Sequence, residues 1–396
     1  MITPAGGDVE ANWKVLAEGR SLATHDPDLA GLRVDISCRV EGFDAALELG
    51  PRLANRLDRF AHLGIVAARQ AVADARLDLP AARPCRVGVV VGVGGNSLHT
   101  YVREFTLLGS GKPARVSPLA LPRSIPSMVA GEIALDLGVR GPNFTVSSAC
   151  ASGTNALGVA RDILLGGGCD VVLAGGAESG RAPMTAATFA QMRALSARTD
   201  RPWLACRPFD RERDGFVLGE GAAILVLERA EHARRRGAPV RAVLRGHGAA
   251  ADAHHPVHPH PEGEGTVLAV QQALADAGCS PRDIGHVNAH GTSTPAGDAA
   301  EARALRRLFP TSVPAVTAVK SVVGHALGAA GAIEAAVTVL SLQRGEVPPT
   351  ANLGQQDPGL ELDIVTGGTR RIEGDLALST SCGFGGQNAA LVFGAA

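Results

Sequence analysis

The chain has 396 residues, of which 45% are hydrophobic and 19% are charged, and its formal net charge is −1. This length is enough for two domains, or for one large duplicated unit, with a substantial buried core. The near-zero charge gives no general attraction to nucleic acid or to a membrane surface, so an acidic partner would need a local basic patch.

The seven cysteines are scattered, without a C-x-x-C motif or other paired spacing. This distribution indicates neither a zinc site nor a disulfide framework, and it favours the reducing cytoplasm. The sequence contains no apolar run of transmembrane length, and its first residues lack the features of a signal peptide. We therefore expect a cytoplasmic location without membrane contact. The cysteines are Cys38, Cys85, Cys150, Cys169, Cys206, Cys279 and Cys382.

Predicted helices and strands alternate at short intervals, which is typical of an α/β layered fold. The strand predicted at 143–146 is short, apolar and preceded by Gly141 and Pro142, so we expect it to be buried. In chain order, helices are predicted at 9–19, 57–75, 125–137, 150–165, 267–277 and 325–342, and strands at 86–91, 143–146, 170–174, 222–227, 240–244, 284–289 and 315–319.

The stretch G-P-N-F-T-V-S-S-A-C-A-S-G-T places Cys150 at the predicted start of an apolar helix. Unpaired N–H groups and the positive end of the helix dipole favour an anion there. We therefore expect the thiol to be shifted toward the thiolate, which is the nucleophile. Small residues between Ser147 and Gly153 leave room for a substrate to reach the sulfur. From these residues alone, a buried structural cysteine is an equally good interpretation.

The two halves of the chain resemble each other. Q-A-V-A-D-A is similar to Q-A-L-A-D-A later in the chain, and each precedes an apolar strand that ends in glycine. A-C-A-S-G-T also overlays G-H-A-L-G-A, which places His325 in the second half where Cys150 lies in the first. We predict two duplicated α/β halves, 1–235 and 236–396, that present these groups to one active site. Chance similarity between alanine-rich helices is the alternative.

Two histidines complete a candidate catalytic set. His290 in V-N-A-H-G-T-S-T-P and His325 in K-S-V-V-G-H-A-L-G lie in small-residue segments at the ends of predicted elements. With a cysteine at a helix start, they suit acyl transfer. Four more histidines occur in H-H-P-V-H-P-H and could hold a metal, but the interleaved prolines favour an exposed loop, so no metal site is predicted. These are His254, His255, His258 and His260.

Six segments occur in a characteristic order and spacing: S-S-A-C-A-S-G-T-N-A, R-P-F-D-R-E-R-D-G-F-V-L-G-E-G-A, N-A-H-G-T-S-T-P-A-G-D-A-A-E, K-S-V-V-G-H-A-L-G-A-A-G-A-I-E, V-P-P-T-A-N-L and G-F-G-G-Q-N. They resemble the β-ketoacyl-acyl-carrier-protein synthases of the thiolase fold, which include long-chain fatty-acid elongating enzymes and type II polyketide ketosynthases. The resemblance covers nearly the whole chain, and six collinear motifs make it specific. It implies a layered α-β-α-β-α architecture and a decarboxylative Claisen condensation in fatty-acid, polyketide or polyene elongation.

The resemblance implies roles for individual residues. Cys150 matches the nucleophile that holds the acyl chain as a thioester. His290 and His325 match the pair that bind the malonyl thioester oxygen and promote loss of carbon dioxide, and Lys320 matches the lysine that orients them. The backbone N–H groups of Cys150 and Phe384 match the oxyanion hole, and Phe384 also matches a gate for the second substrate. Two imidazole donors in a dry pocket can stabilise an enolate, so no cofactor is expected.

The resemblance also implies partners. Thr292 and Thr294 resemble the threonines that hydrogen-bond the phosphopantetheine arm of an acyl carrier protein bearing acyl or malonyl groups. Because such carriers are acidic, Arg52, Arg56 and Arg207 are candidates for docking, with ordinary solvated arginines as the alternative. A homodimer, or a heterodimer with a chain-length-factor-like subunit, is expected.

Two features depart from the family pattern. The strand that opens relatives is missing before M-I-T-P-A-G-G, which would expose its neighbour in the first sheet and lower stability. Cys382 precedes G-F-G-G, where many relatives carry another residue and where thiolases carry a catalytic cysteine in a comparable loop. The alternatives are therefore a thiolase-type enzyme acting on coenzyme A esters and a non-catalytic chain-length-factor-like partner. The histidine in N-A-H-G-T-S-T disfavours the first, and Cys150 disfavours the second.

Overall fold

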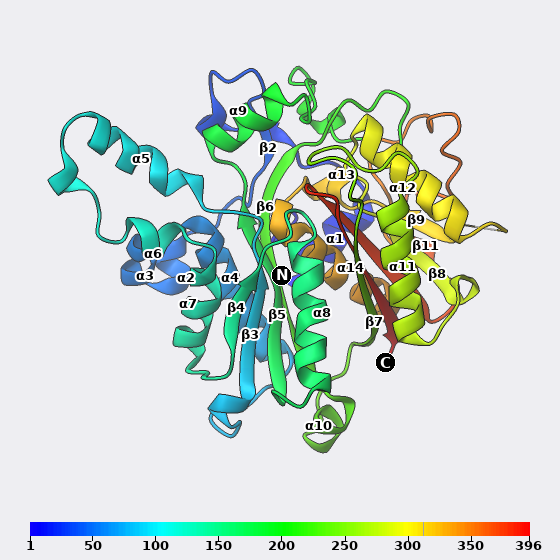
Figure 1. Cartoon of the computed structure of the whole chain (residues 1–396), viewed down its shortest axis with the longest axis horizontal. Coiled ribbons are helices and arrows are strands. Elements are labelled where there is room, and N and C mark those ends of the chain that lie inside the picture. Colours follow the sequence, from blue (N-terminus) through cyan, green and yellow to red (C-terminus); the bar gives the residue numbers. More distant parts are fainter. Residues whose placement is uncertain (312) are drawn as a thin grey trace.

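Two large β-sheets organise the chain, and the computed structural model describes residues 1–311 and 313–396 (Figure 1). Helices cover the outer face of each sheet and fill the space between the sheets. The strands of the first sheet are β1 (Thr24–His25), β2 (Ile36–Cys38), β3 (Val87–Gly92), β4 (Asn143–Val146), β5 (Val171–Ser179) and β6 (Leu218–Glu228); those of the second are β7 (Ala242–Ala251), β8 (Ile284–Asn288), β9 (Ala315–Thr317), β12 (Leu376–Gly383) and β13 (Gln387–Ala395).

The two sheets share one internal order. In the first, β4, β3, β5 and β6 are successive neighbours, parallel except for the antiparallel pair of β5 and β6. In the second, β9, β8, β12 and β13 repeat this arrangement, again with only the last pair antiparallel. This equivalence confirms the duplicated α/β fold that the internal similarity of the sequence predicts.

Alternation of side chains along the strands produces the layers, because successive residues of a strand face opposite sides of its sheet. In β3, Val89 and Val91 pack in the outer core of the first sheet, whereas Val90 packs in the core between the sheets. The result is the predicted α-β-α-β-α architecture. The outer helices are α4 (Arg59–Asp74) and α7 (Ser127–Leu137) on the first sheet and α11 (Glu264–Ala277) and α12 (Pro295–Leu308) on the second, and the central pair is α8 (Ser152–Leu165) and α14 (Ala330–Arg344).

Glycines allow the two central helices to approach closely. A Cβ atom on Gly153 of α8 would lie 2.7 Å from the backbone nitrogen of Ala332 in α14. A Cβ atom on Gly331 of α14 would lie 2.0 Å from the Thr154 hydroxyl oxygen in α8. Since both distances are far below van der Waals contact, larger residues would separate the helices. The segments that precede the two helices therefore lie together, and these segments carry the predicted catalytic groups.

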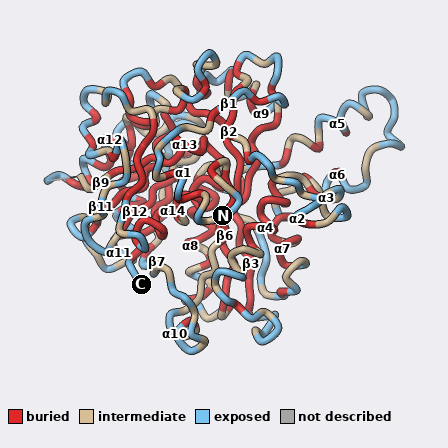
Figure 2. Tube along the Cα trace, turned by 180° about the vertical axis from the view of Figure 1, so that it is seen from behind, coloured by how far each residue is buried: buried red, intermediate tan, exposed pale blue. Residues whose placement is uncertain are grey.

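The remaining elements lie around these layers. Figure 1 shows α5 on an arm that extends away from the sheets, and Figure 2 shows much of this arm as exposed chain. Apolar side chains are uncovered on it, and Phe105 and Val102 are 65% and 52% exposed. These elements are α1 (Val9–Glu18), α2 (Ala45–Leu49), α3 (Pro51–Arg56), α5 (Leu98–Gly109), α6 (Ala120–Ser124), α9 (Pro183–Gln191), α10 (Ala230–Arg235), α13 (Lys320–Val323), β10 (Glu346–Val347) and β11 (Arg370–Arg371).

One predicted feature of the fold is wrong. The strand at 143–146 is present as β4, but it is the edge strand of its sheet and not a buried one, and its Phe144 is 38% exposed. An edge position leaves one side of a strand without a partner, whatever its apolar composition. Near the start of the chain, Ile2 forms an isolated bridge with Ala222 of β6. The lower stability expected from the missing first strand stays a prediction. In the described part of the chain, no helix is long and apolar enough to cross a membrane.

Candidate active site

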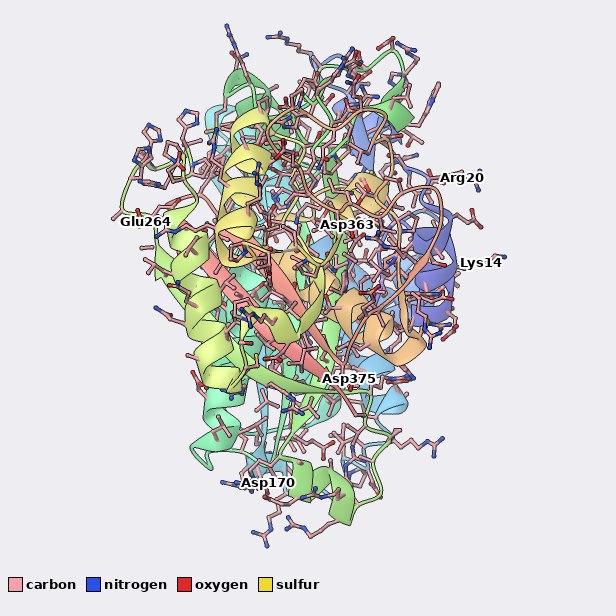
Figure 3. The ribbon with its side chains drawn as sticks, turned by 90° about the vertical axis from the view of Figure 1, so that its right-hand side faces the viewer. Lys14, Arg20, Asp170, Glu264, Asp363 and Asp375 are labelled. Atoms are coloured by element: carbon pink, nitrogen blue, oxygen red, sulfur yellow. The ribbon has the colours of Figure 1, made fainter. Side chains whose placement is uncertain are left out.

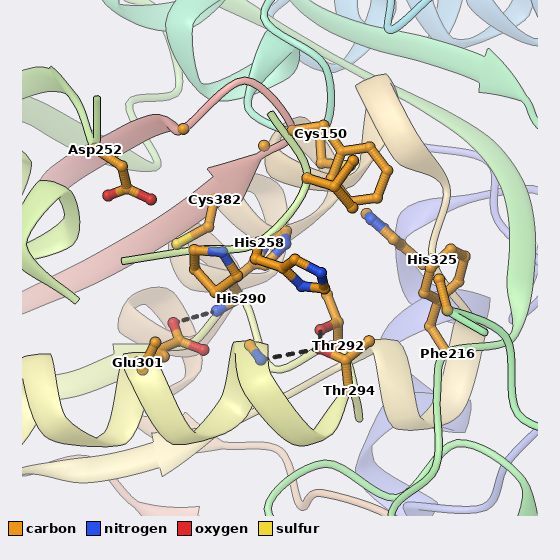
Figure 4. A pocket seen from close by; sticks show the side chains of 18 of the residues that line it. Cys150, Phe216, Asp252, His258, His290, Thr292, Thr294, Glu301, His325 and Cys382 are labelled. Atoms are coloured by element: carbon orange, nitrogen blue, oxygen red, sulfur yellow. Dashed lines mark hydrogen bonds between the residues drawn. The ribbon is translucent and has the colours of Figure 1, made fainter. Parts of the chain in front are cut away.

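A single pocket brings together predicted residues from both halves of the chain (Figure 4). Its empty space, including the part that opens to solvent, is about 840 Å³. Its lining is largely apolar, with a few convergent polar groups. The predicted residues that line it are Cys150, His290, Thr292, Thr294, His325, Cys382 and Phe384.

Cys150 lies in a tight turn just before α8. The preceding Ala149 has a left-handed φ of 48°, an uncommon conformation for a residue with a side chain, and the Ser152 hydroxyl donates to its carbonyl at 2.6 Å. Gly383, at the end of β12, packs on this turn so closely that a Cβ would lie 3.1 Å from the Cys150 nitrogen. The backbone N–H of Phe384 lowers the pKa of the Cys150 thiol. The G-F-G-G loop of the second half therefore contacts the candidate cysteine of the first.

His290 follows β8 and is fixed through its backbone. Its N–H donates to the Glu301 carboxylate at 2.7 Å (Figure 4). The N–H of Gly291 donates to the other carboxylate oxygen at 2.8 Å. Lys320 Nζ donates to the His290 carbonyl at 2.6 Å and lies 3.2 Å from His290 Nδ1. Because an ammonium group can only donate, Nδ1 is the acceptor and the imidazole proton resides on Nε2.

Lys320 forms a buried ion pair with Glu334 of α14, and both side chains are almost fully enclosed. Burial raises the pKa of Glu334 to about 7, and the charge and hydrogen bond of Lys320 oppose this increase. The pair supplies Lys320 with a counter-charge while its remaining donors act on His290. Glu334 thus sets the position of the lysine that holds His290.

His325 precedes α14 and is held by the start of β6 and the residue just before it. Its backbone N–H donates to the Val217 carbonyl at 2.8 Å, and its carbonyl accepts from Gly219 at 2.9 Å. Its ring is edge-on to the Phe216 ring at 5.2 Å between centroids and perpendicular to the His290 ring at 5.4 Å. The two imidazoles therefore face one small volume from different directions.

Both imidazoles are neutral at physiological pH. Burial lowers the pKa of His290 and of His325 well below the ordinary value, and the positive charge of Lys320 lowers both further. A neutral imidazole donates one hydrogen bond without carrying a charge. Such donors in a largely enclosed pocket can stabilise an oxyanion that forms during a reaction.

The expectation that Cys150 favours the thiolate is wrong for the resting protein. Burial raises the pKa of the Cys150 thiol to about 12, and Glu178 and Glu334 add to this increase. Lys320 and the Phe384 N–H lower the pKa but do not compensate for the loss of water around the sulfur. The thiol is therefore protonated until a substrate arrives, and its proton must be transferred during acylation.

We predict that alkylation of Cys150 by iodoacetamide becomes about 100-fold faster between pH 7 and pH 9, because the thiolate fraction rises tenfold per pH unit below the pKa. Mass spectrometry of the Cys150 peptide at each pH measures this rate separately from that of the exposed Cys85. A rate that is already constant at pH 7 would mean that the helix start lowers the thiol pKa after all.

The three arginines predicted to dock a carrier protein differ in their exposure and in their ion pairs. Arg56 pairs with the buried Glu132, and Arg207 is mostly enclosed and pairs with Glu212 at 2.9 Å. Their charges are thus partly satisfied within the chain. Arg52 lies exposed on α3. A docking role for these three residues stays a prediction.

Cys382 also lines the pocket and directly precedes the G-F-G-G loop. Burial raises the pKa of its thiol, and its sulfur lies 3.3 Å from the Thr266 hydroxyl. A protonated, hydrogen-bonded thiol is a poor base at physiological pH, so the geometry gives no support to a thiolase-like role.

Sequence reasoning assigned no role to several residues that shape the pocket. Glu301 binds the backbone of the His290 loop, and it is the last residue of the motif N-A-H-G-T-S-T-P-A-G-D-A-A-E. Phe189 links the rings of Phe216 and Phe384, at centroid distances of 5.3 and 5.9 Å, and no local pattern distinguishes it from a core residue.

Among residues 1–311 and 313–396, no group of three or more acidic, histidine or cysteine side chains could hold a metal ion.

The duplicated fold and this site define a condensing enzyme of the thiolase type. The chain belongs to the β-ketoacyl synthase family: its residues 1–233 match the N-terminal domain of beta-ketoacyl synthases and residues 241–354 match the C-terminal domain. It is 40% identical over 399 aligned positions to 3-oxoacyl-[acyl-carrier-protein] synthase 2 of Vibrio cholerae, an alignment that covers 99% of this chain and 96% of the relative.

Solved structures show the same relationship. The ishigamide ketosynthase/chain length factor superposes with a TM-score of 0.93 at 31% identity, covering 100% of this chain and 97% of the other. A type II polyketide acyl-carrier protein complex with its ketosynthase bound to the hexaketide gives a TM-score of 0.88 at 27% identity, with the same coverage.

Proposed function

We propose that this chain is a β-ketoacyl-acyl-carrier-protein synthase, which condenses malonyl-carrier protein with an acyl chain held as a thioester on Cys150. The observation that carries the proposal is the single pocket in which a thiol of the first half meets two neutral imidazoles of the second. A thiol with two uncharged hydrogen-bond donors suits acyl transfer followed by enolate formation.

In the first step, the Cys150 sulfur attacks the thioester carbonyl of an acyl-carrier protein. The oxyanion of the tetrahedral intermediate accepts hydrogen bonds from the backbone N–H groups of Cys150 and Phe384. The carbon–sulfur bond to the carrier then breaks, and the carrier thiol leaves with the proton that Cys150 loses. The neutral imidazole of His325, in the same pocket, can relay this proton.

In the second step, the bond between the malonyl methylene carbon and its carboxylate breaks, and carbon dioxide leaves. The electron pair forms an enolate whose oxygen accepts hydrogen bonds from His290 Nε2–H and from His325. The enolate carbon attacks the acyl-Cys150 carbonyl, the bond between that carbonyl and the Cys150 sulfur breaks, and the thiolate takes up one proton from water. The product is a β-ketoacyl-carrier protein that is longer by two carbon atoms.

Other pocket residues have supporting roles in this proposal. Thr292 and Thr294 line the pocket with hydroxyl oxygens 3.0 Å apart, a polar pair suited to the amide groups of a pantetheine arm. The Phe384 ring is edge-on to Phe189 and belongs to a glycine-rich loop, which suits movement between the two substrates.

We also propose that the chain works as a dimer, either with a second copy or with a chain-length-factor-like subunit. The exposed edge strand β4 offers unpaired backbone groups, and the apolar side chains on the α5 arm are uncovered. The ishigamide structure, named as a ketosynthase/chain length factor, supports the heterodimer.

We further propose a cytoplasmic location. The seven cysteines are free, which supports this location.

Two pathways are candidates for this activity. Identity of 40% over the whole chain to 3-oxoacyl-[acyl-carrier-protein] synthase 2 favours fatty-acid elongation. The structural likeness to the ishigamide and type II polyketide ketosynthases favours a ketosynthase subunit for polyketides or polyenes.

The proposal is tested by supplying the protein with acyl-carrier protein and malonyl-carrier protein and measuring both products. We expect one carbon dioxide for each β-ketoacyl-carrier protein, and no condensation of acetyl-coenzyme A with itself. Condensation of two acetyl-coenzyme A molecules without malonyl groups would instead identify a thiolase-type enzyme.

A further inference from the structure

The candidate pocket also extends to the outer helices of the second sheet, α11 and α12. Thr266 of α11 and Ala300 of α12 line it, and so does Gly263, directly before α11. Gly263 packs against α12 so closely that a Cβ atom would lie 2.4 Å from the Ala300 carbonyl oxygen. These three residues and Cys382 line one part of the pocket, which we call the outer chamber.

The alternation of side chains along β12 directs Cys382 into this chamber. Thr380 and Cys382 lie on one face of the strand, because alternate residues share a face. The Thr380 hydroxyl donates to the Glu301 carboxylate at 2.8 Å, and the Cys382 sulfur lies 3.3 Å from the Thr266 hydroxyl. Gly383 faces the opposite side and packs on the turn before α8. Cys382 is therefore a wall of the outer chamber.

The outer chamber lies beside His290. Glu301, which holds the backbone of His290, lines the pocket and accepts from Thr380, the neighbour of Cys382 on the strand face. Figure 4 shows Cys382, His290 and Glu301 on one side of the pocket and His325 on the other. A group bound at His290 can therefore extend toward Cys382.

The proposed mechanism places the malonyl methylene carbon next to this chamber. His290 binds the thioester oxygen, and the methylene carbon is bonded to the same carbonyl carbon. The enolate is planar and attacks the acyl group through one face. Any substituent on this carbon therefore lies in the plane of the enolate and needs space beside the imidazoles, which the outer chamber supplies.

The walls of the outer chamber are small and apolar. The Gly263 backbone, the Ala300 methyl group and the Cys382 sulfur leave space between them that longer side chains would occupy. The Thr266 hydroxyl donates to Asn388 at 2.9 Å, so its proton is already engaged. These walls suit a short hydrocarbon group.

The charges around the chamber disfavour an anion. Glu301 and Asp252 line the pocket, whereas none of the lysines and arginines that the structure describes does so. Glu264, the first residue of α11, is at the surface (Figure 3). An anionic group in the chamber would lack a cationic partner, and burial of an unpaired charge is costly. An uncharged substituent fits better than a second carboxylate.

We propose that the outer chamber admits a small apolar substituent on the malonyl group, so that the protein condenses 2-alkylmalonyl as well as malonyl thioesters. This inference rests on the proposed function and specifies its substrate class. Carbon dioxide leaves, the substituted enolate carbon bonds to the acyl carbonyl carbon, and the bond to the Cys150 sulfur breaks. The thiolate takes up one proton from water. The product is a β-ketoacyl-carrier protein with the substituent on its α carbon, and Cys382 determines whether that substituent fits.

The test gives protein preacylated at Cys150 an equal mixture of malonyl- and 2-methylmalonyl-carrier protein, with both configurations at the substituted carbon present. Mass spectrometry of the two β-ketoacyl products gives the ratio of their kcat/KM values. An apolar pocket that accepts or refuses one methyl group changes such a ratio about 10- to 200-fold. We expect the wild type to use the two donors within about tenfold of each other.

Cys382→Phe, which fills the chamber, should lower the relative use of 2-methylmalonyl by at least about tenfold while malonyl is still condensed. Cys382→Leu should lower it in the same direction, and it decides the test if the phenylalanine variant does not fold. Cys382→Ser keeps the size of the side chain and should keep the wild-type ratio. Cys85→Phe adds the same ring at an exposed cysteine and should also keep it.

A preference of the wild type for malonyl above about tenfold overturns the inference, as does an unchanged ratio in the phenylalanine and leucine variants. An equal loss with both donors also overturns it, because the chamber would then hold a part that both donors share. Failure of the proposed function would appear differently, as a wild-type protein that forms no acyl adduct and does not condense malonyl-carrier protein.

Discussion

Replacing Cys150 by alanine is expected to abolish the acyl-enzyme and to lower condensation by at least about 10³-fold, because no other group in the proposed mechanism can hold the acyl chain. Intact mass spectrometry after incubation with acyl-carrier protein measures the adduct. The wild-type protein should gain the mass of one acyl group, and Cys150→Ala should gain none.

Cys382→Ala is the matched control, because it removes the other thiol that lines the same pocket. This variant should still form the adduct. An acyl group on Cys382 in the Cys150→Ala protein would overturn the assignment of the nucleophile. It would also revive the thiolase-type alternative.

His290→Ala and His325→Ala are expected to accept the acyl chain but to condense it about 10² to 10³ times more slowly. Each loses a preorganised donor to the enolate oxygen, and the loss of one such donor costs on this order. Release of labelled carbon dioxide from malonyl-carrier protein by preacylated enzyme measures the step directly.

The histidine variants need a stability control. Both side chains are buried, so unfolding must be compared with that of the wild type. Persistence of the acyl adduct in each variant shows that the pocket is intact. Full condensation activity in both variants would show that the enolate is not formed between these imidazoles.

The convergence of Cys150 and His325 could be predicted from the sequence because the duplication is visible in it. Cys150 precedes α8 in the first half, and His325 precedes α14 at the equivalent position of the second half. Because the two halves pack together through these helices, the two residues must lie close together. The placement of Cys150, His290 and His325 in one pocket is confirmed by the structure, whereas their catalytic roles stay predictions. The division at 235/236 also stays a prediction.

The features that sequence reasoning missed depend on tertiary surroundings. The apolar segment of β4 does not reveal that no strand follows it in the sheet, and its exposure was therefore mispredicted. The start of α8 favours a thiolate, but the walls of the pocket remove water from Cys150 and raise its pKa to about 12. The ion pair of Arg56 with Glu132 likewise joins residues of two different helices, which no local pattern specifies.

The central claim is that the acyl chain on Cys150 is the species that the malonyl-derived enolate attacks. Rapid-quench mass spectrometry of preacylated protein mixed with malonyl-carrier protein tests it most directly. We predict that the acyl-Cys150 mass disappears at the same rate at which carbon dioxide and β-ketoacyl-carrier protein appear. Product formation while acyl-Cys150 persists would contradict the account.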